Sequence, residues 1–416
     1  MRRIGPTVCG FVVLSAALWA MIAVAQQTPS RGQPAANPPA TKQPGEKSKV
    51  AEPAAEKADP YVVPEGTPKE MAAYIRRIAP LPVRDFTALE KKRKAILQAA
   101  EKILAGKADD ADLELGVQAK MSMLDDSKQL AAFIDELKKT GRPRLARMAS
   151  RFSVARELGM AAEQFETEAR MKSPSDKSRE QVKTAVQNVV KYLQEATPEL
   201  DDARLADLSG QAAELIGDNA LAIATYEAVA KAFAANKDAR LAEFTKHMQG
   251  IARRLGLVGN PMEIDGKLLD GKPFDWSKYK GRVVLVDFWA TWCGACVAEM
   301  PELQRYYDFY HAKGFDIIGI SGDRRLADLD RFVKDKKVPW PIVFNGEHPS
   351  PAISYYGIQH LPTMILVGKD GKVLASDIDG FELKRWLAKL LGPMPATEKE
   401  ASKGAASLEP RQPAKK

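Results

Sequence analysis

Two cysteines separated by two residues are the groups in this chain whose type and spacing point to chemistry. Residues 287–296 read Asp-Phe-Trp-Ala-Thr-Trp-Cys-Gly-Ala-Cys, so an apolar run ends and, after a short loop, Cys293 and Cys296 open a predicted helix. At a helix N-terminus, unpaired N–H groups and the positive end of the macrodipole stabilise a thiolate. Since only the thiolate attacks a disulfide, Cys293 is the expected nucleophile. Cys296, one helical turn on, is expected to resolve the mixed disulfide.

Three other interpretations of this cysteine pair are weaker. A structural zinc site needs a second pair of ligands, and the four histidines, at positions 247, 311, 348 and 360, have no metal-binding spacing. A purely structural disulfide closing so short a loop would contribute little through loop-closure entropy. A c-type haem would require a histidine directly after the second cysteine, where Val297 stands. We therefore predict a redox-active Cys293–Cys296 pair, with no metal and no cofactor.

The elements that must position the pair lie in residues 257–391, where short β-rich runs alternate with helical ones. This alternation predicts an α/β layer fold. Residues 283–288 form an almost continuous apolar run, as expected of a central buried strand. Further strands are expected at residues 315–320, 341–344 and 363–367, a hairpin turn at 369–371, and helices at about 293–311, 326–336 and 381–391.

Residues 67–255 show helical periodicity and are predicted to form an all-helical domain, either an antiparallel bundle or a short solenoid. An apolar stripe at helical spacing runs from Val182 to Leu193, and residues 218–255 predict a helical hairpin. We interpret these stripes as core-facing surfaces. The region carries no catalytic constellation, and the sequence leaves open whether it docks a protein partner.

The two ends of the chain predict export and disorder. In residues 1–25, Arg2 and Arg3 precede an apolar run that ends in Ala23-Val24-Ala25, which has the features of a cleaved signal peptide. The run at residues 8–25 is also nearly long enough to anchor an uncleaved chain in a bilayer. Either outcome predicts a periplasmic or cell-envelope location. Residues 26–66 and 393–416 are rich in Pro, Ala and Lys and predict a disordered linker and tail.

Cysteine usage and charge narrow the class of protein further. Cys9 lies inside the apolar run, so an exported and cleaved chain keeps one close pair of cysteines, which suggests a working redox pair. Hydrophobic residues make up 45% and charged residues 28%, as in an ordinary soluble globular protein. The net charge of +8 is mild, and no Lys/Arg stripe with interleaved aromatics occurs. A nucleic-acid partner is therefore not expected.

The sequence around the pair resembles the thioredoxin superfamily, in particular the exported TlpA/ResA-like thiol–disulfide oxidoreductases. The resemblance lies in the motif Cys293-x-x-Cys296-x-x-Glu299-x-Pro301 and in the lead-in segments at residues 264–267 and 280–286. It covers about residues 257–391 and says nothing about residues 67–255. The fold that it implies is a central mixed sheet with flanking helices.

The resemblance also implies roles for individual residues. Leu361-Pro362-Thr363 matches the family's cis-proline loop, which faces the cysteines and guides the substrate backbone. Glu299 matches a carboxylate near the cysteines, and Asp287 matches a buried aspartate. In an apolar pocket such a carboxyl has a raised pKa and can accept the proton that Cys296 must lose. The alternatives are that Glu299 faces solvent and that Asp287 is only a hydrogen-bonded strand end.

Three further positions bear on the site. Trp289 and Trp292 are expected to pack around the dithiol, with Trp292 next to the nucleophile and in contact with substrate. The alternative is that either tryptophan is an ordinary core residue. His360 occupies a position where many relatives have glycine. It would approach the dithiol if it has a role, although a lone histidine is more often just a loop residue.

The dipeptide between the cysteines, Gly294-Ala295, lacks a histidine, so the loop has less positive charge to stabilise the thiolate and we expect a reducing couple. The sequence as a whole predicts an exported enzyme that reduces disulfides in other exported proteins. The resemblance implies that a membrane-borne electron donor, which the sequence does not identify, re-reduces the enzyme. The alternative is a binding scaffold, in which the helical domain docks proteins and the thioredoxin-like domain is accessory or redox-regulated.

Overall fold

The computed structural model describes residues 59–83, 85–124, 126–171, 173–346 and 350–395. The predicted signal peptide, most of the predicted linker and most of the predicted tail lie outside these residues. The chain divides into two compact units, residues 1–181 and 182–416. The division falls inside a helix, so the last helices of the region predicted as a helical domain belong to the same unit as the sheet.

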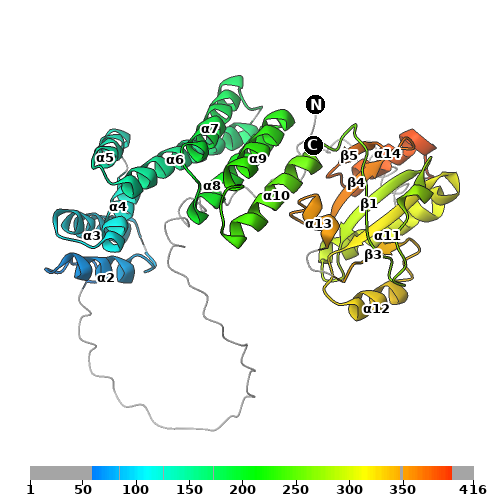
Figure 1. The fold of residues 1–416 in the computed structure, drawn as a ribbon, viewed down its shortest axis with the longest axis horizontal. Helices are drawn as coiled ribbons and strands as arrows, with labels where there is room; N and C mark the ends of the chain where they lie inside the picture. Colours follow the sequence, from blue (N-terminus) through cyan, green and yellow to red (C-terminus); the bar gives the residue numbers. More distant parts are fainter. Residues whose placement is uncertain (1–58, 84, 125, 172, 347–349, 396–416) are drawn as a thin grey trace, which may run out of the picture. The chain divides into compact units, whose positions relative to one another are not determined.

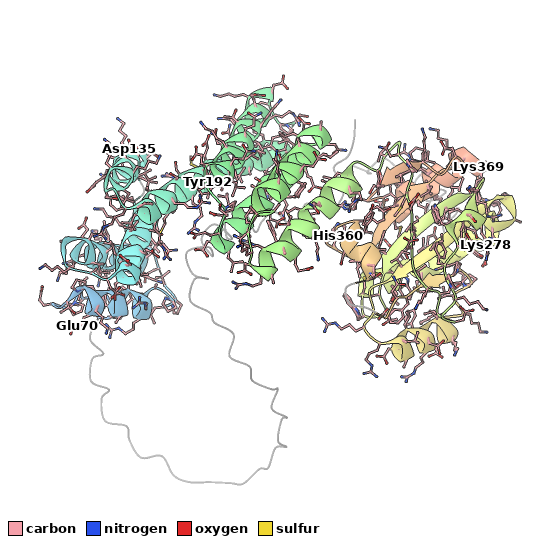
Figure 2. All side chains as sticks on the ribbon, viewed as in Figure 1. Glu70, Asp135, Tyr192, Lys278, His360 and Lys369 are labelled. Carbon is pink, nitrogen blue, oxygen red and sulfur yellow. A yellow bond between two sulfur atoms is a disulfide. The ribbon has the colours of Figure 1, made fainter. Side chains whose placement is uncertain are left out.

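The described part of the first unit is helical, as predicted (Figure 1). A capping box begins α2: the Thr67 hydroxyl accepts a hydrogen bond from the N–H of Glu70, and the Glu70 carboxylate accepts one from the N–H of Thr67. Figure 2 marks Glu70 on this helix. The helices are α2 (Pro68–Ile78), α3 (Phe86–Ala105), α4 (Asp110–Met123), α5 (Ser127–Lys139), α6 (Pro143–Met171) and the beginning of α7 (Asp176–Gln194).

The predicted disorder of residues 26–66 is wrong at its C-terminal end. Tyr61 and Val63 are partly buried against the core formed by α2 and α3. The Tyr61 N–H donates to the Asp59 carboxylate, and the Tyr74 hydroxyl donates to the carbonyl of Pro60. These two side chains supply apolar burial of the kind that a disordered segment lacks.

The second unit continues the helical run with α8 (Ala203–Leu215), α9 (Asn219–Phe233) and α10 (Ala239–Leu255). Residues 218–255 form the predicted helical hairpin. Tyr226 of α9 is fully buried, and its ring lies so close to α8 that a Cβ on Gly210 would be 2.2 Å from it. No helix within the described residues is long and apolar enough to cross a bilayer.

Residues 257–391, here called the sheet domain, form a five-stranded mixed sheet in the order β3-β2-β1-β4-β5. The three strands β1, β2 and β3 are parallel, whereas β4 runs antiparallel to β1 and pairs with β5 in a hairpin. The predicted fold class is thereby confirmed. The strands are β1 (Val283–Trp289), β2 (Phe315–Ser321), β3 (Ile342–Val343), β4 (Thr363–Val367) and β5 (Val373–Ser376).

The central strand β1 is buried along its whole length and separates two apolar layers. Alternate side chains of a strand point to opposite faces. Val284, Val286 and Phe288 therefore pack with Tyr356 and Ile365 on one face. Leu285 and Trp289 pack on the other, against α11 (Gly294–Tyr310) and α14 (Gly380–Leu391). Asp287, between Leu285 and Trp289 in this alternation, is thus directed to the α11 face.

Candidate active site

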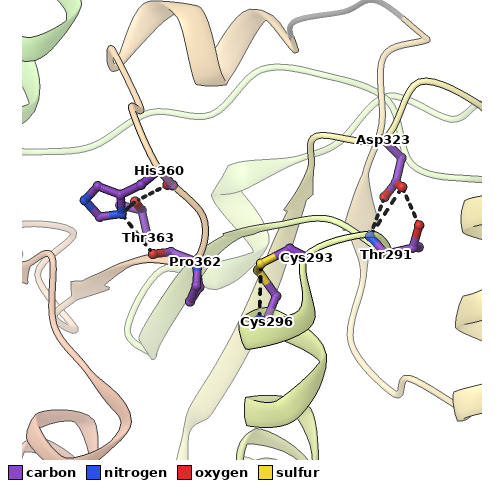
Figure 3. The surroundings of a disulfide bond; sticks show 7 residues. All are labelled: Thr291, Cys293, Cys296, Asp323, His360, Pro362 and Thr363. Carbon is purple, nitrogen blue, oxygen red and sulfur yellow. Dashed lines mark hydrogen bonds between the residues drawn. A yellow bond between two sulfur atoms is a disulfide. The ribbon is translucent and has the colours of Figure 1, made fainter. Parts of the chain in front are cut away.

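The two cysteines form a disulfide at the start of α11 (Figure 3). Cys293 is the N-cap of the helix, and its Sγ accepts a hydrogen bond of 3.2 Å from the N–H of Cys296. Both residues are buried, with an exposed fraction of 8% for Cys293 and 3% for Cys296. After reduction, the same N–H and the helix dipole would act on the Cys293 sulfur and favour its thiolate form.

The loop that faces the disulfide contains a cis peptide bond between Leu361 and Pro362, which confirms the predicted cis-proline. Pro362 lies beside the disulfide in Figure 3. Thr363 begins β4, is buried, and donates a hydrogen bond of 2.8 Å from its hydroxyl to the carbonyl of His360. Leu361 is partly buried and packs against both apolar layers of the sheet domain.

His360 is not brought to the dithiol. Its ring lies on the side of Pro362 away from the cysteines (Figure 3), with Nδ1 3.3 Å from the Pro362 carbonyl and 3.4 Å from the Thr363 hydroxyl. His360 is therefore a residue of the cis-proline loop, which agrees with the alternative that a lone histidine is an ordinary loop residue.

Asp287 is a buried carboxyl in the middle of the central strand, with 3% exposure. Its Oδ1 atom is buried and makes no hydrogen bond to the described residues. Burial, and to a smaller extent the nearby charge of Glu299, raises its pKa to about 7. The strand-end alternative does not describe this environment, because the carboxyl is desolvated rather than paired.

Glu299 lies on α11 one turn beyond Cys296 and is partly buried. Its Oε2 atom is buried without a hydrogen-bond partner among the described residues. Burial raises the pKa of this carboxyl, and the negative charge of Asp379 adds to the effect. Glu299 therefore does not simply face solvent. With Asp287 it forms a pair of acids whose protonated forms are favoured on the α11 side of the sheet.

The two tryptophans of the motif have different environments. Trp289 is fully buried, packs against Phe332 and belongs to the same core as both cysteines. Trp292 is 66% exposed although it directly precedes Cys293. The expectation that both pack around the dithiol is therefore wrong for Trp292, which instead offers a large apolar surface beside the disulfide.

Sequence reasoning missed a network that holds the loop before the cysteines. The Asp323 carboxylate accepts hydrogen bonds from the N–H of Thr291 at 3.1 Å and from its hydroxyl at 2.5 Å (Figure 3). A third comes from the Ser321 hydroxyl at 2.9 Å. Asp323 is 4% exposed, so its carboxylate is shielded from solvent and holds the loop through these hydrogen bonds. The available sign was its place two residues after β2, because the carboxyl ends of the parallel strands β1 and β2 lie at the same edge of the sheet.

No group of three or more His, Cys, Asp or Glu side chains among the described residues could hold a metal ion. The groups available for chemistry at this site are the two sulfurs, the two desolvated carboxyls and the cis-proline loop.

Comparisons with known proteins match this part of the chain. A model of the Redoxin family matches residues 257–385. A thiol–disulfide oxidoreductase ResA from Bacillus thuringiensis subsp. konkukian (strain 97-27) is 36% identical over 125 residues, which cover 30% of this chain and 69% of that protein. A thiol–disulfide oxidoreductase ResA from Geobacillus thermodenitrificans (strain NG80-2) is 30% identical over 105 residues, which cover 25% of this chain and 59% of that protein.

A solved structure is similar over the same fraction of the chain. It is the thioredoxin domain of a thiol–disulfide oxidoreductase from Bacteroides vulgatus, which is 32% identical and has a TM-score of 0.30. The match covers 32% of this chain and 97% of that one.

Removal of the Asp323 carboxylate should destabilise the sheet domain. In Asp323→Ala, the Thr291 N–H and two hydroxyls lose their acceptor, and an unsatisfied buried polar group costs about 1–3 kcal/mol. We expect a lower urea midpoint by tryptophan fluorescence. The matched control is Asp328→Ala, which removes a surface ion pair with Arg325 and should cost less than about 1 kcal/mol. Equal midpoints for the two variants would contradict this role of Asp323.

The buried Asp287 carboxyl should make stability depend on pH. Because its pKa is about 7 in the folded chain and 3.8 in the reference state, the folded state binds the proton more tightly. The free energy of unfolding should then fall as the pH rises from about 4 to about 8, by at most about 4 kcal/mol.

Asp287→Asn should remove this slope, measured on the oxidised chain, in which neither cysteine titrates. The exposed Asp265→Asn is the matched control and should keep the slope. An unchanged pH dependence in Asp287→Asn would show that Asp287 is not the group responsible.

Proposed function

The chain belongs to the ResA-like thiol–disulfide oxidoreductases of the thioredoxin superfamily, and from that premise we propose that it is exported and reduces disulfides in other exported proteins. The observation that carries the proposal is the Cys293–Cys296 pair at the N-terminus of α11, opposite a cis-proline loop. Export rests on residues 1–25 of the sequence, and a periplasmic or cell-envelope location follows from it.

Reduction takes place in two exchanges. The Cys293 thiolate attacks one sulfur of the substrate disulfide, so that a mixed disulfide forms, the substrate S–S bond breaks and the departing sulfur takes up a proton. The Cys296 thiolate then attacks the Cys293 sulfur and releases the second substrate sulfur, which is also protonated. Two electrons pass to the substrate, and the enzyme ends as the Cys293–Cys296 disulfide, which is the form in the structure.

Proton handling falls to the two buried acids. Cys296 must lose a proton before it attacks, and it lies in the core layer on the α11 face of β1, the face to which Asp287 is directed. The Asp287 carboxyl has a pKa of about 7, so its carboxylate can accept this proton near neutral pH and later return it. Glu299, one turn beyond Cys296, is the second acceptor on the same helix.

Substrate contact falls to Trp292 and to the backbone of the cis-proline loop. The Trp292 side chain offers apolar area next to the nucleophile, and the Leu361-Pro362-Thr363 segment offers backbone to an extended polypeptide. A disulfide in a protein substrate would lie between them, within reach of Cys293.

Turnover requires a second partner. The oxidised enzyme must receive two electrons from a dithiol donor, whose disulfide is the other product of that exchange. The family resemblance implies a membrane-borne donor. The absence of histidine between the cysteines supports a reducing couple, since the thiolate lacks that extra stabilisation.

Cysteine variants of the full chain test this function. With insulin as substrate and dithiothreitol as donor, Cys293→Ser should reduce insulin no faster than dithiothreitol alone. Cys296→Ser should accumulate a mixed disulfide through Cys293, visible on a non-reducing gel and released by excess thiol. Cys9→Ser is the matched control and should keep the wild-type rate, because Cys9 lies outside the sheet domain.

Full activity in Cys293→Ser would refute the proposal that Cys293 is the nucleophile of a thiol–disulfide oxidoreductase. If a partner captured through residues 67–255 bound equally well in the wild type and in a variant that lacks both active-site cysteines, the scaffold alternative would be favoured instead.

A further inference from the structure

Helix α10 and the sheet domain touch backbone to backbone, within the second compact unit. A Cβ on Gly250 of α10 would lie 2.6 Å from the Gly357 nitrogen, and one on Gly357 would lie 2.4 Å from the Ile251 nitrogen. Gly357 also has a φ of 56°, which disfavours other residues. Glycine inside a helix costs about 1 kcal/mol relative to alanine, so Gly250 weakens α10 where it approaches α13 (Pro351–Tyr355).

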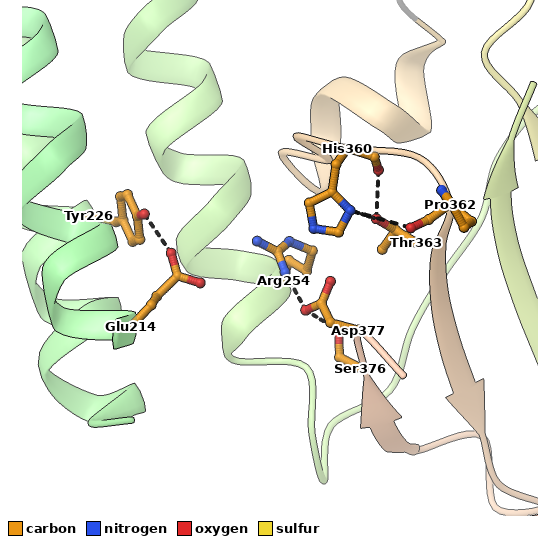
Figure 4. Close-up of polar contacts among 8 residues, drawn as sticks. All are labelled: Glu214, Tyr226, Arg254, His360, Pro362, Thr363, Ser376 and Asp377. Carbon is orange, nitrogen blue, oxygen red and sulfur yellow. Dashed lines mark hydrogen bonds and ion pairs between the residues drawn. The ribbon is translucent and has the colours of Figure 1, made fainter. Parts of the chain in front are cut away.

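Two consecutive arginines at the end of α10 reach two different parts of the sheet domain. The Arg253 guanidinium lies 3.7 Å from the centre of the Tyr355 ring and donates a hydrogen bond to the Tyr355 carbonyl. Arg254 makes an ion pair with Asp377, directly after β5 (Figure 4). These contacts hold the end of α10 to both segments.

The Arg254 pair is buried on the arginine side, where the side chain is 5% exposed. A charge so placed is stable only with a partner, and removal of one member of a buried pair is costly. Burial raises the pKa of the nearby Glu214, whereas the Tyr226 hydrogen bond of 2.6 Å and the Arg254 charge oppose that rise. The arginine is thus compensated by Asp377 of the sheet domain and by Glu214 of α8 (Figure 4).

These contacts lie on both sides of the cis-proline loop in the sequence. Gly357 lies five residues before Pro362, and the next residue, Ile358, is buried under the sheet. On the other side, Ile378 follows Asp377 and donates its N–H to the carbonyl of Met364, the second residue of β4. Helix α10 therefore fastens the chain before the loop, through Gly357, and after it, through Asp377.

We propose that α10 is a positioning element for the cis-proline loop, with Gly250 and Arg254 setting where Leu361, Pro362 and Thr363 present their backbone to a polypeptide disulfide. The inference rests on the proposed function and deepens it. A small disulfide needs only the Cys293 sulfur, whereas an extended polypeptide also needs the loop. The end of the helical region is then a working part of the oxidoreductase, and its effect is selective for polypeptide substrates.

The test uses the full chain with Gly250→Ala, in which α10 gains helix propensity while the new methyl group overlaps the Gly357 backbone. Hydrogen exchange of the amides in residues 357–363 should accelerate, and exchange in α11 should not. We expect kcat/KM for insulin to fall about tenfold or more, since small misplacements of positioning groups have effects of this order. The rate with oxidised glutathione should stay within about twofold.

Two control variants and a second test variant are measured beside Gly250→Ala. Gly116→Ala places the same substitution in α4 of the other unit, where the atoms nearest to the new methyl group belong to Ile103 and Ala100. It should change neither the two rates nor the exchange of the loop amides. Arg254→Met should reproduce the selective loss on insulin. Arg240→Met, at the exposed start of the same helix, should not. Arg254→Met also serves if Gly250→Ala does not fold.

The inference is overturned if folded Gly250→Ala and Arg254→Met keep the wild-type exchange in residues 357–363, or if they lose activity equally on insulin and glutathione disulfide. If the wild type reduces neither disulfide while loop exchange still rises selectively in the variants, the proposed function fails and the positioning role of α10 stands.

Discussion

The cap that the Cys293 sulfur forms at the start of α11 is the contact on which the proposed chemistry of this protein depends. Cys293 caps α11, and the N–H of Cys296 points at its Sγ. A helix end can do this only if it is held in place, and the buried strand β1 delivers it. The parallel neighbour β2 ends at the same edge, where Asp323 fixes Thr291, two residues before the nucleophile. The thiolate site is thus a consequence of sheet topology.

The same helix has the opposite electrostatic preference further on. The N-terminus of α11 favours a negative charge, whereas the apolar layer between α11 and β1 disfavours one. Asp287 and Glu299 in this layer therefore keep their protons to a higher pH than ordinary carboxyls. After reduction, the helix N-terminus would favour the Cys293 thiolate, whereas burial raises the pKa of Glu299 and raises that of Asp287 to about 7. This difference between the two ends of the site is the basis of the different roles that we propose for Cys293 and Cys296.

Local pattern predicted the elements well, and it failed for contacts between distant segments. The strand at 363–367 and the helix at 326–336 have the predicted bounds, because periodicity and flanking turns are local properties. The cis-proline followed from the family motif. The Asp323 network depends on the register of β1 and β2, which the sequence does not encode locally. Gly250 looks like a weak point in a helix until Gly357, more than a hundred residues on, lies against it.

The most direct measurement is the pH dependence of iodoacetamide alkylation at Cys293 in the reduced full chain, read by mass spectrometry, with the urea-unfolded chain as control. If the cap and dipole of α11 stabilise the thiolate, half-maximal alkylation of the folded chain falls at least about one pH unit below the value of about 8.5 for a free thiol, and unfolding restores that value. Half-maximal alkylation at or above the unfolded value would contradict the account at its foundation.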